Sequence, residues 1–162
     1  MTDIAERAGM GVTALYRYFP NKQAILRELA LSVFEHDRES LVIADLAPGA
    51  PLDELVHDAV LAYWHLHRDE PYRLRLRAAV MADAELSALD LADSRRNATL
   101  LARRGSELIG TADTAMLERK VFLAISLLDA VMHTASLLDA AQADTLIEDF
   151  ATMVVAMITG AG

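Results

Sequence analysis

The segment 2–22, TDIAERAGMGVTALYRYFPNK, most constrains what this chain can fold into, because it predicts two short helices joined by a tight turn. The first helix has an apolar stripe of Ile4, Ala5 and Ala8, at the three- and four-residue spacing of one helical face. Gly9 stands where a helix ends in a backbone turn that glycine adopts without strain. This arrangement predicts a helix-turn-helix.

The second helix of the pair is predicted over 12–18, with Gly11 at its N-cap. Leu15 and Phe19 face inward at helical spacing, and we expect Met10 to be buried in the turn. The outward face then consists of Val12, Thr13, Tyr16 and Arg17. An exposed second helix with aromatic and basic groups is what a helix-turn-helix inserts into the major groove of DNA.

Several separated residues of this segment form a characteristic pattern: Ile4-Ala5, Ala8-Gly9, Leu15-Tyr16, Phe19, Asn21-Lys22 and Ala24-Ile25-Leu26. In this pattern the segment strongly resembles the DNA-binding domain of the tetracycline-repressor (TetR) family. The resemblance implies an all-α protein with an N-terminal helix-turn-helix DNA-binding head and a helical ligand-binding and dimerisation body. It also implies a transcriptional regulator. The alternative is that the segment is only a packing hairpin.

Six residues are our candidates for DNA contacts: Thr2, Val12, Thr13, Tyr16, Arg17 and Lys22. The resemblance implies that Tyr16 and Lys22 reach the phosphate backbone, and Lys22 stands at a helix N-terminus, which itself attracts anions. Arg17 is the expected base reader, because its guanidinium can grip guanine O6 and N7. The alternative for Arg17 is a salt link to a nearby carboxylate. Val12 and Thr13 offer an apolar and a hydroxyl contact, and Thr2 can reach the backbone or a base.

The sequence also departs from the family's pattern. Gly11 replaces the usual Ser or Thr N-cap at a small cost, and Val12 can touch a thymine methyl but cannot donate a hydrogen bond to a base. Thr13 replaces the usual Gly or Pro, and Tyr18 replaces the usual His. The helix that normally precedes the motif has no counterpart here. We therefore expect the working protein to carry residues before Met1; the alternative is impaired DNA binding.

Composition and charge exclude several classes of protein. With 54% hydrophobic and 24% charged residues the chain is that of a folded protein, without cysteine, an apolar run long enough to span a membrane, or a signal peptide. We therefore expect no membrane partner and a cytoplasmic location. The net charge of −9 argues against nucleic acid, but residues 1–40 carry five basic and six acidic side chains. The remaining −8 belongs to residues 41–162, so the body is acidic and the head nearly neutral.

Beyond the head, Asn21 is a good N-cap for a long amphipathic helix that runs to about Ala44 and connects the head to the body. The Pro- and Gly-rich stretch 47–51 breaks this helix. We therefore place the DNA-binding domain at 1–45 and the ligand-binding and dimerisation domain at 46–162. Further helices are predicted over 52–68, 71–81, 86–109, 113–138 and 146–158.

Two features of the body allow more than one interpretation. The run from Arg73 to Arg77 alternates like a strand, but we interpret it as helical because no second strand exists to pair with it. The last two helices carry wide apolar faces that suit a four-helix bundle between two copies, and the resemblance implies a homodimer through them. Such a dimer would place two recognition helices about 34–36 Å apart on a palindrome. The alternative is that both faces pack into the monomer core.

Few residues suggest catalytic or metal chemistry. His65 and His67 point in different directions on a helix, and His57 lies two turns before His65, so we interpret all three as solvent or core histidines. No nucleophile triad, phosphate-binding loop or metalloprotease helix is present. We expect no enzyme, no metal and no cofactor.

A ligand pocket is expected in the helical body, as the resemblance implies. The candidate residues are large, adaptable or polar-tipped groups on apolar faces, namely Trp64, Met81, Phe122 and His133. Each can instead be plain core. His133 is the most pocket-like of them, since its polar ring lies among apolar neighbours and needs a partner.

These observations predict a homodimeric repressor that a small-molecule effector releases from a palindromic operator in double-stranded DNA. The effector would act by changing the separation of the two recognition helices. The alternative is a helical ligand-binding or scaffold homodimer that has lost DNA binding. An all-α enzyme is a third hypothesis, for which the sequence offers no paired acid and base.

Overall fold

The computed structural model describes residues 1–43, 51–110 and 113–160, and all regular structure in these residues is helical. The predicted all-α fold is confirmed. The helices within the described ranges are α1 (Thr2–Arg7), α2 (Val12–Tyr18), α3 (Lys22–Ile43), α4 (Leu52–Asp69), α5 (Tyr72–Met81), α6 (Ala84–Ile109), α7 (Thr114–Ala135) and α8 (Ala140–Thr159).

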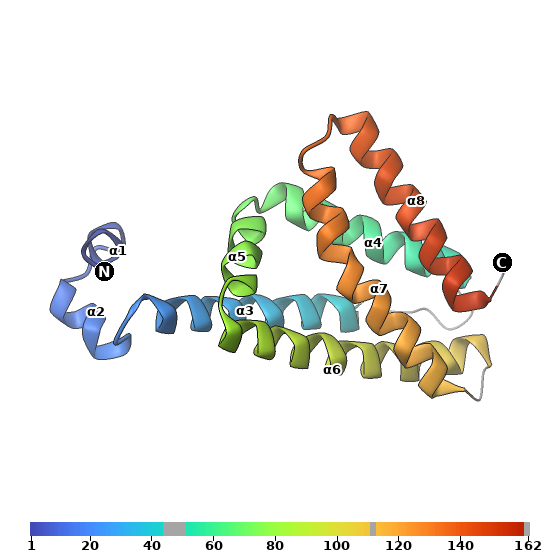
Figure 1. Cartoon of the computed structure of the whole chain (residues 1–162), viewed down its shortest axis with the longest axis horizontal. Coiled ribbons are helices and arrows are strands. Elements are labelled where there is room, and N and C mark those ends of the chain that lie inside the picture. The colour runs from blue at the N-terminus through green and yellow to red at the C-terminus, as the bar shows by residue number, and fades with distance from the viewer. Residues whose placement is uncertain (44–50, 111–112, 161–162) are drawn as a thin grey trace.

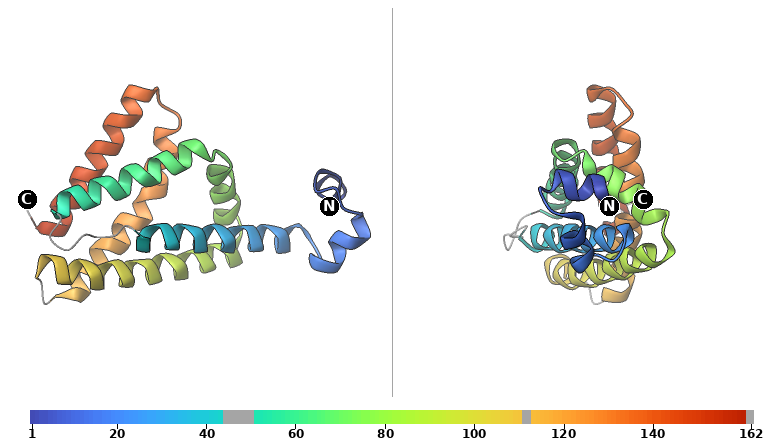
Figure 2. Two further views of the ribbon diagram at one scale, coloured as in Figure 1. Left: turned by 180° about the vertical axis from the view of Figure 1, so that it is seen from behind. Right: turned by 90° about the vertical axis from the view of Figure 1, so that its left-hand side faces the viewer.

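The helices are arranged as a small head on a long arm (Figure 1). Helices α1 and α2 form the head at one end of the molecule, and α3 runs from the head along α6 into the body. Helices α4, α7 and α8 form the far side of the body, and α5 joins α4 to α6. The view from behind in Figure 2 shows the same separation of head and body, and in the end-on view the head lies in front of the body.

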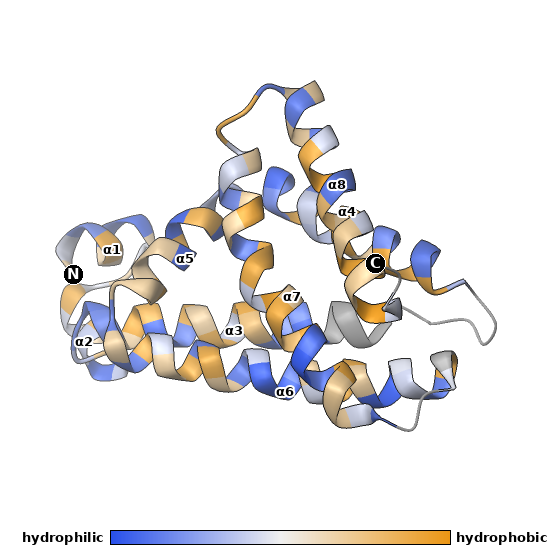
Figure 3. Ribbon diagram, turned by 45° about the vertical axis from the view of Figure 1, so that its right-hand side comes forward, coloured by the Kyte–Doolittle hydropathy of each residue, from blue (hydrophilic) through white to orange (hydrophobic). Residues whose placement is uncertain are grey.

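Three apolar clusters hold the body together, and hydrophobic residues recur along the helices that form them (Figure 3). The largest cluster joins α4, α7 and α8 around Trp64, Met132 and Phe150. A second joins α3 to α5 and α6 through Ala30 and Leu76. A third joins α6 to α7. Since α3 shares the second cluster, the arm that carries the head is packed directly on the body.

Local sequence explains where the helices begin and end. The Asn21 side chain accepts a hydrogen bond from the Ala24 N–H at 2.8 Å, as its predicted N-cap role requires. Asp83, Asp113 and Asp139 cap α6, α7 and α8 in the same way. The predicted break at 47–51 and the boundary at 45/46 lie outside the described residues, apart from Pro51, which precedes α4.

The alternating run in α5 is helical, as predicted, and the helix places its arginines on different faces. Arg73 and Arg77 are four residues apart and therefore share one face of the helix. Arg73 is buried and Arg77 half-buried, so this face is directed inward, while Arg75 between them is exposed. No helix in the described part of the chain is both long and apolar enough to cross a membrane.

Candidate DNA-binding head and effector cavity

The turn between α1 and α2 has the geometry that the sequence predicts. Gly9 adopts a φ of +63°, and its N–H donates to the Glu6 carbonyl oxygen at 3.1 Å. Ala5 on α1 is fully buried and Leu15 on α2 nearly so, and each is the one buried residue of its helix. The predicted burial of Met10 is wrong: Met10 lies in the turn and is 38% exposed, while the buried residues of the two helices are Ala5 and Leu15.

The six candidate DNA-contacting residues all lie in the head or at its junction with α3, and all are exposed: Thr2, Val12, Thr13, Tyr16, Arg17 and Lys22. Half of Tyr16 is accessible, and Val12 lies one turn away on the same face of α2. Among the described residues Arg17 forms no ion pair, so the alternative of a salt link to a neighbouring carboxylate is not observed. The outward face of α2 is therefore a free surface at the tip of the molecule.

Ion pairs attach the arm to the body. Arg73 Nη1 on α5 donates to Asp37 Oδ1 on α3 at 2.6 Å, and Arg38 Nη2 on α3 donates to Asp93 Oδ1 on α6 at 2.5 Å. Arg73 also donates from Nε to Glu70 Oε2 at 2.7 Å. These contacts raise the pKa of Arg73 even though its burial acts in the opposite direction. The end of α3 that enters the body is thus held on two sides by charge-assisted hydrogen bonds.

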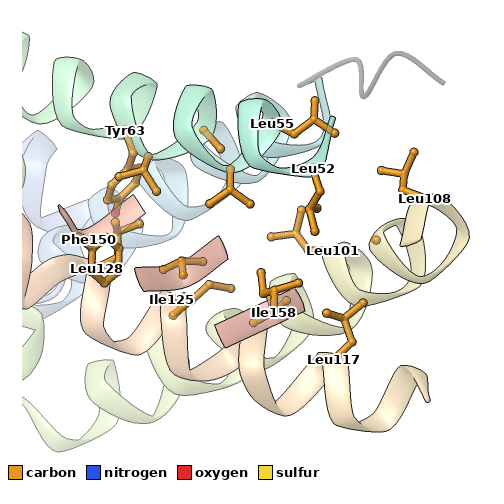
Figure 4. A pocket seen from close by; sticks show the side chains of 17 residues that line it. Leu52, Leu55, Tyr63, Leu101, Leu108, Leu117, Ile125, Leu128, Phe150 and Ile158 are labelled. Atoms are coloured by element: carbon orange, nitrogen blue, oxygen red, sulfur yellow. The ribbon is translucent and has the colours of Figure 1, made fainter. Parts of the chain in front are cut away.

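An apolar cavity of about 170 Å³ lies between α4, α6, α7 and α8, and side chains from all four helices point into it (Figure 4). Among the described residues that line it, the Tyr63 hydroxyl is the only polar side-chain group. The remaining lining residues are apolar or glycine: Leu52, Leu55, Val56, Ala59, Val60, Leu101, Gly105, Leu108, Leu117, Val121, Ala124, Ile125, Leu128, Phe150, Val154 and Ile158. A cavity of about 150 Å³ with similar walls stays dry and binds benzene.

Gly105 sets the separation of α6 and α7 at the cavity wall. A Cβ atom at this position would lie 3.2 Å from Leu117 Cδ2, which is tighter than an ordinary contact. The absence of a side chain at Gly105 lets the two helices approach closely there.

A second, polar cavity of about 100 Å³ lies beside the first and is bounded by α3, α4, α5, α6 and α7. Arg77 is its central cation: Nη2 pairs with Asp129 Oδ2 at 2.5 Å, and Nη1 donates to Asp90 Oδ1. The Tyr63 hydroxyl donates to Asp129 Oδ1 at 3.3 Å. Burial raises the pKa of Asp129 and Asp90 adds to this, while Arg77 opposes it. We call this space, which charged side chains line together with apolar ones such as Phe34 and Leu76, the polar chamber.

Comparison with known protein families shows to which family the chain belongs. Residues 1–29 match the model of the bacterial regulatory proteins of the tetR family, and residues 50–160 match a tetracyclin repressor-like C-terminal domain. The chain belongs to the TetR family. Neither the curated proteins nor the solved structures that were compared include a match to it. The protein is therefore a DNA-binding transcriptional regulator and not an enzyme.

In this TetR-family protein the four residues expected at a ligand pocket are not brought together, and none lines either cavity. Trp64 on α4 is core, in one apolar cluster with residues of α7 and α8. Met81 is 60% exposed, and His133 is exposed on α7. Phe122 is half-buried, with the Arg95 guanidinium 5.8 Å above its ring.

Sequence patterns miss the cavity because its walls are ordinary aliphatic positions of four amphipathic helices. Periodicity marks such positions as inward but does not show where the inward faces leave space between them. One feature of the sequence could have predicted the polar chamber. Arg73 stands in the apolar stripe of α5 with Leu76 and Val80, and a charge in such a stripe requires a buried partner.

The histidines of the TetR-family body do not form a shared site. His57 pairs with Glu148 at 3.5 Å, His65 is exposed, and His67 is buried with its Nδ1–H donating to the Tyr63 carbonyl oxygen at 3.0 Å. Burial lowers the pKa of His67, and its backbone hydrogen bond acts against that shift. Within the described ranges no group of three or more His, Asp or Glu side chains has an arrangement suited to a metal ion.

Proposed function

We propose that this regulator is a homodimeric cytoplasmic repressor that binds a palindromic operator and leaves it when a small-molecule effector occupies the cavity in its body. One observation carries the proposal. The free outward face of α2 stands at the tip of an arm, α3, whose other end is clamped to the helices that surround both cavities. A change in those helices would therefore change the position of the reading head.

The exposed groups of the head suit the two kinds of contact that a DNA-binding protein needs. Tyr16 and Lys22 are proposed to bind phosphates, which would fix the position of α2 in the major groove. Arg17 is proposed to read guanine, at about 1–3 kcal/mol of discrimination. Val12 and Thr13 are proposed to contact base edges, and Thr2 is proposed to contact the DNA backbone or a base.

The outer surface of α7 and α8 supports a dimer through these helices. Leu123 and Leu127 lie one turn apart on α7 and are 48% and 38% exposed, and Met153 on α8 is 47% exposed. Inner positions of the same helices, such as Met132 and Ile147, are fully buried. Helix α7 thus has one face in the monomer core and exposed leucines on another, and α8 adds the exposed Met153. These exposed apolar groups suit a four-helix bundle between two copies.

The proposed release mechanism needs only a modest coupling between effector and operator, about 1–3 kcal/mol. Tyr63 lines both cavities and donates to Asp129, whose partner Arg77 lies on the same face of α5 as Arg73. Arg73 in turn holds Asp37 of the arm. An effector that displaces Tyr63 would reach α3 through this set of contacts.

The test of DNA reading is fluorescence anisotropy with the intergenic DNA upstream of the protein's own gene, over a salt series. We expect specific binding that weakens steeply with salt, and a loss of about 1–3 kcal/mol in Arg17→Ala. Tyr16→Ala should weaken binding as well. Matched controls are Arg75→Ala and Tyr72→Ala, which remove exposed side chains of the same types from α5 in the body. Weak binding that neither head substitution changes would instead favour a dimer that has lost DNA binding.

A further inference from the structure

The two cavities of the body are neighbours with a common wall. Tyr63, Ile125 and Leu128 appear in the lining of both the apolar cavity and the polar chamber. A molecule longer than the apolar cavity would therefore meet the chamber at its Tyr63 end, if these side chains move aside. The chemistry of the chamber then determines what such a molecule must carry at that end.

The chamber holds more carboxylates than cations. Four carboxylates line it, namely Asp37, Asp90, Asp93 and Asp129. Only three guanidiniums of the described residues pair with them, those of Arg38, Arg73 and Arg77. Arg77 alone serves both Asp90 and Asp129. Burial is the main cause of the raised pKa of Asp129; Arg77 lowers this pKa, and the neighbouring Asp90 raises it further.

A buried acceptor in the same chamber also lacks a donor. Asn97 lines the chamber and is only 8% exposed. Its Nδ2 donates to Asp93 Oδ2 at 2.9 Å, but its Oδ1 has no partner among the described residues. Buried polar atoms are nearly always hydrogen-bonded, so an unsatisfied acceptor calls for a donor from outside the protein. The Arg38 Nε also lacks a partner in the described part of the chain and would need an acceptor, but Arg38 does not line the chamber. A group that enters the chamber therefore meets Asn97 Oδ1, which needs a donor, and the surplus of carboxylates favours a donor that is positively charged.

We propose that the effector is a hydrophobic amine, with its apolar body in the cavity between α4, α6, α7 and α8 and its ammonium group in the polar chamber near Asn97 and Asp129. This assignment rests on the proposed ligand-released function and names the class of ligand. An ammonium supplies several donors and one positive charge in a small volume. The apolar cavity has room for a hydrocarbon group of modest size, and its described walls offer no charged partner and no polar side-chain group besides the Tyr63 hydroxyl.

The test is isothermal titration calorimetry of the protein without DNA, with three probes that share one chain: n-octylamine, 1-octanol and octanoate. We expect octylamine to bind at least about tenfold more tightly than octanol, and at least about a hundredfold more tightly than octanoate. Equal binding of amine and alcohol would mean that the chamber only holds water, and would overturn the proposal. Tighter binding of octanoate, or no binding of octylamine, would overturn it too.

Two substitutions locate the two parts of the ligand. Asp129→Asn keeps the shape of the chamber and leaves Arg77 its pair with Asp90, and it should weaken octylamine by at least about tenfold while octanol changes by less than about twofold. The unchanged alcohol then shows that the variant is folded. Asp58→Asn, on the exposed side of α4, is the matched control. Ala124→Phe fills the apolar cavity and should abolish binding of both probes. If the Asp58→Asn control lost the preference for octylamine over octanol, the assignment would be contradicted.

The outcomes separate this proposal from the proposed function. Calorimetry reports the ligand class whether or not the protein binds DNA. If octylamine binds as expected but operator affinity does not respond to it, the class of ligand stands and the release mechanism fails. If DNA binding is normal but octylamine does not bind, the ligand class fails and the regulator remains.

Discussion

Arg73 on α5 donates to Asp37 on α3 at 2.6 Å, and only 3% of the Arg73 side chain is accessible to solvent. This pair joins the arm that carries the DNA-reading head to a helix that lines the polar chamber. A buried ion pair of this kind adds little net stability, because desolvation offsets most of the attraction. The pair instead fixes one arrangement of α3 on the body. Removing one partner is destabilising, because the remaining charge stays desolvated without a counter-charge.

Arg73→Met should therefore lower the free energy of unfolding by about 3 kcal/mol, since Asp37, whose side chain is only 15% accessible, is left without its cation. Urea denaturation followed by circular dichroism gives this value. The double variant with Asp37→Leu should be less destabilised than the sum of the two single variants, because no unpaired charge remains. Arg75→Met, on the exposed side of the same helix, is the control. An equal effect of Arg73→Met and Arg75→Met would contradict the role of the pair.

Tyr63→Phe should separate effector binding from effector response. The ring that lines both cavities is kept, but the hydrogen bond to Asp129 is lost. We expect octylamine to bind within about threefold of wild type, while its effect on operator affinity falls by about 0.5–2 kcal/mol. Tyr72→Phe removes a similar but exposed hydroxyl–carboxylate contact, with Glu70, and serves as control. An unchanged response in Tyr63→Phe would exclude this hydroxyl from the coupling.

His67 should make the fold sensitive to mild acid. Burial lowers its pKa below 6.5 in the folded protein, so the unfolded chain binds a proton that the folded chain does not. Stability is therefore full above pH 6.5 and falls as the pH drops from 6.5 towards the folded pKa, by at most about 1.4 kcal/mol per pH unit for one group. Thermal unfolding from pH 8 to pH 5 should show a shallower decline in His67→Phe. The exposed His65 supplies the control His65→Phe, and parallel curves for wild type and His67→Phe would refute the assignment.

Leu123→Arg should convert the proposed dimer to a monomer, because it puts a charge into the centre of the apolar face of α7. The side chain is 48% exposed in one copy, so the monomer fold should tolerate the change. Leu91 on α6 has nearly the same exposure, 44%, and Leu91→Arg is the matched control. Analytical ultracentrifugation measures both. A protein that sediments as a monomer before substitution would rule out the dimer.

The sequence predicted the helices and the head well because these depend on local patterns. Gly9 and Asn21 determine a turn and a cap through their own backbone and side chain, and Leu15 is inward by simple helical spacing. The burial of Met10 was not predictable in the same way, because an apolar residue in a turn is buried only if other segments cover it, and Met10 is 38% exposed.

The body was less predictable because its sites are made by contacts between distant segments. Asp37 and Arg73 lie 36 residues apart, and Tyr63 and Asp129 lie 66 apart. Spacing along one helix does not show which of these groups meet. Trp64 and His133 attracted attention by residue type, yet one is core and the other is exposed.

The most direct test of the account is the affinity for upstream intergenic DNA with and without a saturating amount of whichever of octylamine and 1-octanol binds more tightly. We predict a weakening of about 5- to 150-fold in wild type and in the exposed control Ala92→Phe. The cavity-filled Ala124→Phe variant should bind the DNA as wild type does and show no response. An affinity in wild type that the saturating ligand leaves unchanged would contradict the link between the cavity and the reading head.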